Sequence, residues 1–473
     1  MKAINAIYRE PILPEHKGNP LIEALPPKIN KSELIEELSF YPIYDSEIRK
    51  KDDFIREEYL SRIDTLRQPL PEYIECFRLI ESALKESYSS KNPFSPSTQN
   101  YLHYLKPSDS YIIPHTGPFA PKGSAISLIG ESGIGKSKML TQILHYFPQV
   151  VIHKSYKEKD LRLKQLIWIK IECPHDASLR GLCHAILGEI DRALEVEDTT
   201  PERNIDTLLD QIERKVRSSF VGIIVIDEMQ NLNIGKAGGA QKLLSFLLNL
   251  INRSGVPVLF CGNPDVAETF SDTFRNARRA ESGGYISMDR LSPEVWSIFC
   301  EELWILQWTN IETPLNNQLS ERLYMLSCGI IDIAIRIYKK AQELVIGSSN
   351  ELITLEVLDM AYPIACPLTE NELSKIRRND QTKKSLLSIL KKVADETPVT
   401  NEVDSRNKTI AGDLTRPQHP EFSKKLTDLQ NAVNLHDRIS DPDVFQRASE
   451  DDSPTEYLKK LGILCDDPLT MFS

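Results

Sequence analysis

Gly130-Glu131-Ser132-Gly133-Ile134-Gly135-Lys136-Ser137 is the stretch that decides the fold of this chain. It fits the phosphate-loop pattern G-x-x-x-x-G-K-[ST], which needs a strand before it and a helix after it. The apolar run Ala125–Ile129 predicts the strand, and the apolar spacing across residues 139–144 predicts an amphipathic helix. A glycine-rich turn can match the pattern by chance, but strand, loop and helix in this order make chance the weaker interpretation.

The residue types of this loop predict contacts with a nucleoside triphosphate. Its glycines let backbone N–H groups point at phosphate oxygens, and the helix N-terminus adds its positive end. We expect Lys136 to reach the β- and γ-phosphates and the Ser137 hydroxyl to ligate Mg²⁺. The expected cofactors are ATP and Mg²⁺, and the candidate nucleotide-binding residues are Gly130, Glu131, Ser132, Gly133, Ile134, Gly135, Lys136, Ser137 and Lys138.

A second apolar run ends in two acidic residues. Val221–Ile226 is continuous and rich in β-branched residues, as expected for a strand buried on both faces, and Asp227 and Glu228 follow it. In a parallel sheet the two carboxylates would emerge beside the phosphate loop. We expect Asp227 to hold Mg²⁺ through water and Glu228 to act as general base on the water that attacks the γ-phosphate. Two solvated acids are the alternative, but downstream of a phosphate loop ATP hydrolysis is the stronger interpretation.

Composition and charge narrow the class of protein. The 473 residues are 41% hydrophobic and 26% charged, which is typical of a globular protein of roughly three domains. A net charge of −11 argues against a surface coated in positive charge, but it leaves room for a local basic surface. We found no apolar run long enough for a membrane span and no signal peptide, so we expect a cytoplasmic protein. Scattered cysteines and histidines predict reduced thiols and no metal-ligand cluster.

Patterns along the chain predict four regions. Residues 1–118 are Pro-rich and extended at first and then helical, at 32–39, 53–66 and 72–86. Residues 119–290 alternate strands and helices, which predicts an α/β fold with a doubly wound five-stranded parallel sheet. Its strands are expected at 125–129, 166–171, 221–226, 256–263 and 285–288. Residues 291–375 look all-helical, and 376–473 are a polar linker with an acidic tail that either folds onto a partner or frays.

These motifs together resemble the AAA+ ATPases, which implies a helical lid domain after the α/β domain. The resemblance makes Asn263 the first sensor near the γ-phosphate, with a simple turn before Pro264 as the alternative. It implies that Arg278 or Arg279, ahead of Arg275, is an arginine finger acting on a neighbouring subunit. A complement to the helix dipole is the alternative for these arginines. Arg336 is a candidate second sensor, and a solvated helix residue is its equal alternative.

The N-terminal region carries a narrower resemblance. The stretches that look like TnsC and its TniB relatives, the AAA+ regulators of heteromeric (TnsABC-type) bacterial transposition, are Asn19–Pro27, Gln68–Pro71, Lys91–Pro93, Cys173–Arg180, Val225–Leu232 and Ala277–Arg279. The resemblance implies a bacterial protein that assembles with ATP on double-stranded DNA, as a ring or filament of roughly six or seven subunits per turn. It also implies that the N-terminal region faces a TnsD/TniQ-type target selector and the C-terminal tail faces TnsA/TnsB-type transposase subunits.

Contacts with DNA are expected in the most basic stretch of the α/β region, residues 153–164. Its cations could neutralise phosphates without reading bases, and a solvated surface is the near-even alternative. The candidate DNA-binding residues are Lys154, Lys157, Lys159, Arg162, Lys164 and Arg180, with Lys236 as a further guess.

Two other functions are the alternatives. An AAA+ initiator or helicase loader has the same ATPase site, and Asn19–Pro27 favours the transposition group over it. A nucleotide-switched protein scaffold with negligible hydrolysis fits the acidic chain, but Glu228 argues against it.

Overall fold

The computed structural model of the chain describes residues 3–95, 98, 123–175, 178–234, 246–248, 250–251, 254–271 and 278–378. The chain divides into two compact units, residues 1–365 and 366–473. Arg275, Lys236, most of the helix expected near 239–252 and the tail from residue 379 lie outside the described residues.

A five-stranded, all-parallel sheet lies at the centre of the first unit, in the order β5-β6-β7-β2-β8. Its strands are β2 (Ala125–Gly130), β5 (Trp168–Glu172), β6 (Ile223–Asp227), β7 (Val258–Gly262) and β8 (Gly284–Met288). The predicted five-stranded α/β sheet is therefore confirmed. Because the strands are parallel, their carboxyl ends meet at one edge, and β7 lies between the phosphate-loop strand β2 and the acidic strand β6.

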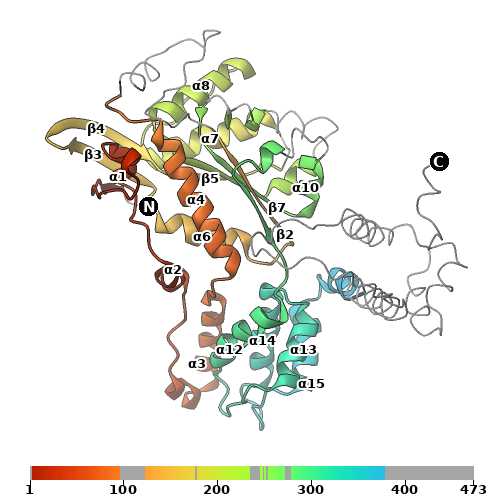
Figure 1. Cartoon of the computed structure of the whole chain (residues 1–473). Coiled ribbons are helices and arrows are strands. Elements are labelled where there is room, and N and C mark those ends of the chain that lie inside the picture. The colour runs from red at the N-terminus through yellow and green to blue at the C-terminus, as the bar shows by residue number, and fades with distance from the viewer. Residues whose placement is uncertain are drawn as a thin grey trace, which may run out of the picture. The chain divides into compact units, whose positions relative to one another are not determined.

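Helices cover both faces of this sheet (Figure 1). Side chains alternate along each strand, so Ile169, Ile171, Ile224 and Ile226 enter one core with the apolar faces of α7 (Leu179–Leu194) and α8 (Ile205–Ser218). The opposite face is covered by α4 (Pro71–Ser89) and by α6 (Lys136–Tyr146), whose apolar residues at 139–144 are buried as their spacing predicts. A further helix, α10 (Pro264–Ser271), follows β7.

The region after the sheet is helical, as expected. Its helices are α12 (Pro293–Ile305), α13 (Asn317–Ser327), α14 (Ile331–Val345) and α15 (Leu355–Ala365). The N-terminal region contains β1 (Ile4–Asn5), η1 (Pro14–His16), α1 (Pro20–Glu23), α2 (Lys31–Leu38), η2 (Ser46–Lys50), α3 (Asp53–Tyr59) and η3 (Leu60–Thr65) before α4.

Residues 150–166 form an antiparallel hairpin of β3 (Val150–Tyr156) and β4 (Lys159–Leu166), which the sequence analysis did not anticipate. The strand expected at 166–171 is wrong at its start, because Leu166 ends β4 and β5 begins at Trp168. Lys157 and Glu158 form the turn with φ of 47° and 65°. Such turns usually carry Asn or Gly, so this one lacks the usual sequence signal for a hairpin.

The N-terminal region packs on this hairpin and on α4. Strand β1 pairs in parallel with β3 and completes a three-stranded sheet. The side chain of Asn19 caps α1 by accepting from the Leu21 N–H at 3.1 Å, and it donates to the Tyr88 carbonyl on α4 at 2.7 Å. Leu21, Ile22 and Leu25 are buried. The Asn19–Pro27 stretch therefore packs largely within its own chain.

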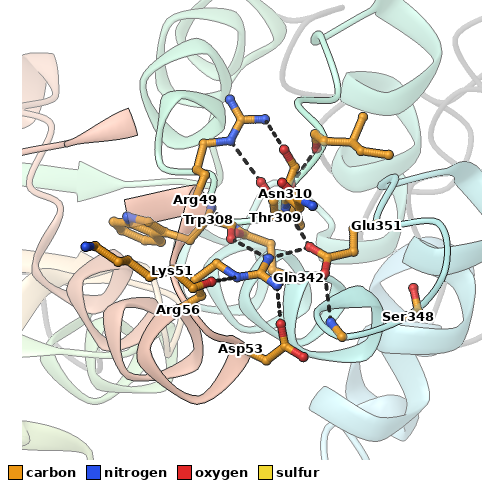
Figure 2. A network of polar contacts seen from close by, with 12 residues as sticks. Arg49, Lys51, Asp53, Arg56, Trp308, Thr309, Asn310, Gln342, Ser348 and Glu351 are labelled. Atoms are coloured by element: carbon orange, nitrogen blue, oxygen red, sulfur yellow. Dashed lines mark hydrogen bonds and ion pairs between the residues drawn. The ribbon is translucent and has the colours of Figure 1, made fainter. Parts of the chain in front are cut away.

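A network of polar contacts ties residues 45–65 to the helical region, as Figure 2 shows. The buried Arg56 guanidinium contacts both carboxylate oxygens of Glu351 and donates to the Trp308 carbonyl at 3.1 Å. Arg49 donates to the Thr309 carbonyl at 2.9 Å. Residues 71–89, by contrast, pack on the sheet, so the short segment 66–70 bridges the α/β and helical parts.

No helix in the described residues is long and apolar enough to span a membrane. The seven cysteines in the described part of the chain are free and buried. Within the same residues, no group of three or more His, Cys, Asp or Glu side chains is placed to hold a metal ion.

Candidate nucleotide-binding site

A cavity of about 320 Å³ opens at the carboxyl edge of the sheet, within the range of small-ligand pockets. Five parts of the chain line it: the phosphate loop, the acidic end of β6, the end of β7, the N-terminal segment and the helical region. The lining residues are Leu66, Arg67, Gln68, Tyr73, Ser132, Gly133, Ile134, Gly135, Lys136, Ser137, Lys138, Asp227, Glu228, Gln230, Gly262, Phe299, Ile331, Asp332 and Ile335.

Backbone geometry explains two glycines of the phosphate loop. A Cβ on Gly130 would lie 2.3 Å from the Met288 carbonyl oxygen of β8, so only glycine fits there. Gly135 has φ of 104° at the N-cap of α6, a conformation that side chains disfavour. Together they let the loop curl back over the N-terminus of α6, where anions bind.

Lys136 lies folded over the loop. Its ammonium donates to the carbonyls of Gly130 at 2.6 Å and Glu131 at 2.8 Å. Burial lowers the pKa of Lys136, while the nearby charges of Asp227 and Glu228 act in the opposite direction. When a nucleotide binds, this ammonium can exchange its two hydrogen bonds to backbone carbonyls for hydrogen bonds to phosphate oxygens.

Asp227 and Ser137 meet where Mg²⁺ is expected. Burial alone would raise the pKa of Asp227, but Lys170 and hydrogen bonds from Cys261 and Ser137 hold it below its usual range. The carboxylate is therefore ionised beside a hydroxyl. Mg²⁺ prefers oxygen ligands and is commonly held by one or two carboxylates together with substrate phosphates. These residues fit Mg²⁺.

Glu228 has an unusual backbone conformation. Its φ of 57° is rare for a residue with a side chain, and such strain is often found at functional sites. The side chain is half-buried and accepts a hydrogen bond from the amide of Gln230. Its backbone N–H donates to Asp227 Oδ1 at 3.0 Å. The turn at the end of β6 therefore links the two acidic residues by a hydrogen bond and places the Glu228 carboxylate against Gln230.

Asn263 directly follows β7, next to Gly262 of the cavity wall. Its amide nitrogen donates to Asp265 at 3.0 Å, while its buried Oδ1 has no hydrogen-bond partner. A buried polar atom without a partner is rare and calls for an explanation. Because β7 lies between β2 and β6, Asn263 follows the strand that lies between the phosphate-loop strand and the acidic strand, although it is not among the described residues that line the cavity.

Arg278 is exposed and Arg279 is half-buried, in the short helical stretch before β8. Neither is among the described residues that line the cavity of their own chain. The Arg279 carbonyl accepts hydrogen bonds from the backbone and the hydroxyl of Ser282, which fix the turn into β8.

The helical region contacts the phosphate loop through the start of α14. A Cβ on Gly133 would lie 3.3 Å from Ile330 and 3.8 Å from Asp332. Arg336 forms an ion pair with Asp332 at 2.6 Å, and its side chain is 51% exposed. Among the described residues that line the cavity are Asp332 and Ile335, but not Arg336.

Among the site residues that the sequence analysis missed, two groups stand out. Leu66, Arg67, Gln68 and Tyr73 form the N-terminal wall of the cavity. Gln68–Pro71 stood out only as a resemblance, and no periodicity or motif marks such a wall. Lys170 was also missed as a site residue, because the sequence analysis assigned it only to a strand. A cation inside a buried apolar strand was the signal that could have identified it.

The basic candidate residues lie together on the β3–β4 hairpin. Lys154, Lys157, Lys159, Arg162 and Lys164 are all exposed there. The hairpin is held from the N-terminal side, since the Glu23 carboxylate accepts from the Tyr156 hydroxyl at 2.8 Å. Arg180 lies elsewhere, at the start of α7, and donates to the carbonyls of Arg203 at 2.7 Å and Glu202 at 3.2 Å. Lys236 lies outside the described residues.

Residues 122–270 match the family model of the AAA domain. The α/β part of this chain has the AAA+ phosphate-loop fold. The AAA domain match spans the phosphate loop, Asp227, Glu228 and Asn263. No curated protein matches the chain.

Solved structures that resemble the chain share low sequence identity with it. The Orc1 protein of Aeropyrum pernix in complex with DNA is 17% identical, with 59% of this chain and 68% of that chain covered and a TM-score of 0.37. Cdc6p of Pyrobaculum aerophilum is 14% identical, with 69% and 76% covered and a TM-score of 0.39. Domain III of the replication initiation protein DnaA of Thermotoga maritima is 14% identical, with 52% and 85% covered and a TM-score of 0.29. Likenesses at this level carry no argument about function on their own.

Proposed function

We propose that this protein binds and hydrolyses ATP in the cavity at the carboxyl edge of its sheet. The observation that carries the proposal is the convergence there of Lys136, the Ser137–Asp227 pair and Glu228 on an AAA+ fold. A structural turn with the same sequence would have no need for a cavity lined by an acid with a strained backbone.

The residues divide the chemistry among them. Lys136 and the loop N–H groups hold the triphosphate, and Ser137 and Asp227 hold Mg²⁺, which when bound neutralises charge on the phosphates. Glu228 orients the attacking water and accepts its proton. The free Oδ1 of Asn263 can accept a hydrogen bond from the same water. Leu66, Ile331 and Ile335 add apolar side chains to the cavity lining, and such a lining can hold the base of the nucleotide.

Oligomerisation and DNA binding form the next part of the proposal. Arg278 is exposed, Arg279 is half-buried, and neither is among the described residues that line the cavity of its own chain, as expected of a finger that completes a neighbour's site. The exposed cations of the β3–β4 hairpin can neutralise DNA phosphates in an otherwise acidic protein. Arg180 and Lys164 are weaker candidates for DNA, because both already donate to backbone carbonyls. Arg180 donates to Arg203 and Glu202, and Lys164 donates to Leu194 at 2.7 Å.

Two more specific functions are compatible with this core: an AAA+ initiator or helicase loader, and a regulator of transposition. The comparisons fit the initiator or helicase-loader type better. Of the three solved structures named above, one is described as a replication initiation protein and one is in complex with DNA. A regulator of transposition, which would bridge a TnsD/TniQ-type target selector to TnsA/TnsB-type transposase subunits, is supported only by the resemblance of stretches such as Asn19–Pro27. No comparison reported above names a transposition protein.

DNA binding by the purified protein, with ADP or with a slowly hydrolysed ATP analogue, tests the common core of both assignments. Gel shift and negative-stain imaging should show rings or filaments on double-stranded DNA only with the analogue. Nucleotide-independent binding, or none, would instead favour the protein scaffold. Recruitment of a transposase or of a replicative helicase to the assembled complex would then separate the two finer assignments.

A further inference from the structure

Lys170 on β5 lies beside the Asp227 carboxylate. Its ammonium is 3.0 Å from Asp227 Oδ2 and 3.4 Å from the Thr141 hydroxyl on α6. In the parallel pairing of β5 and β6, Lys170 lies opposite Val225 and Glu172 lies opposite Asp227. Residues two apart on a strand share a face, so Lys170 and Asp227 point to the same side of the sheet.

Both oxygens of the Asp227 carboxylate are already engaged. Oδ1 accepts from the Glu228 N–H at 3.0 Å, while Oδ2 lies against Lys170. The side chain of Asp227 is 5% exposed and that of Lys170 is 23% exposed. A buried carboxylate is costly unless it is paired, and here an ammonium pairs with it before any metal arrives.

We propose that Lys170 is the resident counter-ion of Asp227 and makes Mg²⁺ binding depend on nucleotide. The inference rests on the proposed function, because it concerns the same metal site. A divalent cation that approaches Asp227 alone meets the repulsion of Lys170 at close range. A triphosphate adds enough negative charge to offset that repulsion, so the metal enters together with the nucleotide. Lys170 acts through Asp227 and is a positioning residue.

Direct metal binding to the nucleotide-free protein tests this proposal, with Mn²⁺ as the probe and electron paramagnetic resonance as the readout. We expect Lys170→Met to bind Mn²⁺ about tenfold more tightly than the wild type, because the repulsive charge is gone. Lys170→Arg keeps the charge and should bind Mn²⁺ as weakly as the wild type. Adding Asp227→Asn to Lys170→Met should abolish the gain.

Equal Mn²⁺ affinity of the wild type and Lys170→Met would overturn the proposal. If Lys170→Met does not fold, as judged by its thermal melt, Lys170→Gln serves instead, because it keeps most of the side-chain length and can still donate to Thr141. Binding of a fluorescent ATP analogue is measured in parallel. If the wild type does not bind the ATP analogue, the proposed function is wrong. The metal assay without nucleotide would still decide the role of Lys170.

Discussion

Arg56 and Glu351, 295 positions apart in the chain, form a buried two-point ion pair between the N-terminal region and the helical region. Glu351 is also held by backbone N–H groups, from Asn310 at 2.6 Å and Gly347 at 2.9 Å. Both Glu351 carboxylate oxygens and the Arg56 guanidinium therefore have hydrogen-bond partners (Figure 2). The contact fixes the segment that leads into the cavity wall at Leu66 and Arg67.

Removing one member of this pair should destabilise the protein strongly. Arg56→Met leaves the Glu351 carboxylate buried without its cation, at a cost of about 3 kcal/mol. Thermal and urea unfolding measure that loss. Lys50→Met is a matched control, because Lys50 is a nearby exposed cation, and it should change stability by less than about 0.5 kcal/mol. Similar stability of the two variants would contradict the structural role of the pair.

Glu351 also predicts how stability depends on pH. Burial raises its pKa, but hydrogen bonds from Arg56, Asn310 and Gly347 outweigh this and lower the pKa from 4.5 to about 2. A carboxyl with a lowered pKa in the folded state stabilises fully above pH 4.5, and this stability is lost as the pH falls toward 2. The difference corresponds to roughly 3 kcal/mol. Comparing unfolding of the wild type and Glu351→Gln across this range should show a flatter acid limb for the variant.

Lys136→Ala should weaken nucleotide binding strongly, and ATP-dependent assembly should fail with it. The variant loses the ammonium expected to face the phosphates, at about 2 kcal/mol or roughly thirtyfold in affinity. A fluorescent ATP analogue measures binding, and negative-stain imaging on DNA measures assembly. The exposed neighbour Lys138 provides the control variant Lys138→Ala, which should lose less affinity. ATP-dependent assembly that survives in Lys136→Ala would refute the phosphate-loop assignment.

Glu228→Gln should bind ATP but hardly hydrolyse it. Loss of the general base is expected to slow turnover on the order of 100-fold or more, while the phosphate contacts remain. The bound complex on DNA should therefore be long-lived. Single-turnover hydrolysis and the lifetime of the DNA complex are the measurements. Normal turnover in this variant would rule out Glu228 as the base.

Mixing subunits tests the arginine finger. If Arg278 or Arg279 acts on a neighbouring site, the inactive Arg278→Ala/Arg279→Ala protein should regain activity when mixed with Glu228→Gln protein. Each supplies what the other lacks at one shared interface. Activity measured against the mixing ratio should peak at intermediate ratios. A finger that works within its own chain would give no such peak.

The sequence predicts most of the sheet because its strands are short apolar runs that end in polar motifs. Ile223–Asp227 and Val258–Gly262 are buried along their whole length, so hydrophobicity alone marks them. The phosphate loop is equally visible, since Gly130 and Gly135 are required by local geometry. Both features could be predicted because they depend on the residues within one short stretch of sequence.

The hairpin and the cavity wall could not be predicted in the same way. Lys157 and Glu158 adopt left-handed conformations that their residue types do not signal. Arg67 and Gln68 line the cavity because residues 45–65 are anchored on the helical region and residues 71–89 on the sheet. Such positions depend on tertiary contacts like Arg56–Glu351, which no local pattern records.

The salt dependence of DNA binding by the hairpin should report the number of phosphates that its cations contact. Lys154 and Arg162 are exposed there, so each charge removed should lower the slope of log affinity against log salt by about one. Fluorescence anisotropy with the ATP analogue and duplexes of different sequence measures it, and the loss should be the same for every sequence. The charge-matched control Lys50→Ala, which lies far along the chain on η2, should leave the slope unchanged. A loss confined to one DNA sequence would mean that the hairpin reads bases, and an unchanged slope in Lys154→Ala/Arg162→Ala would move the DNA interface away from the hairpin.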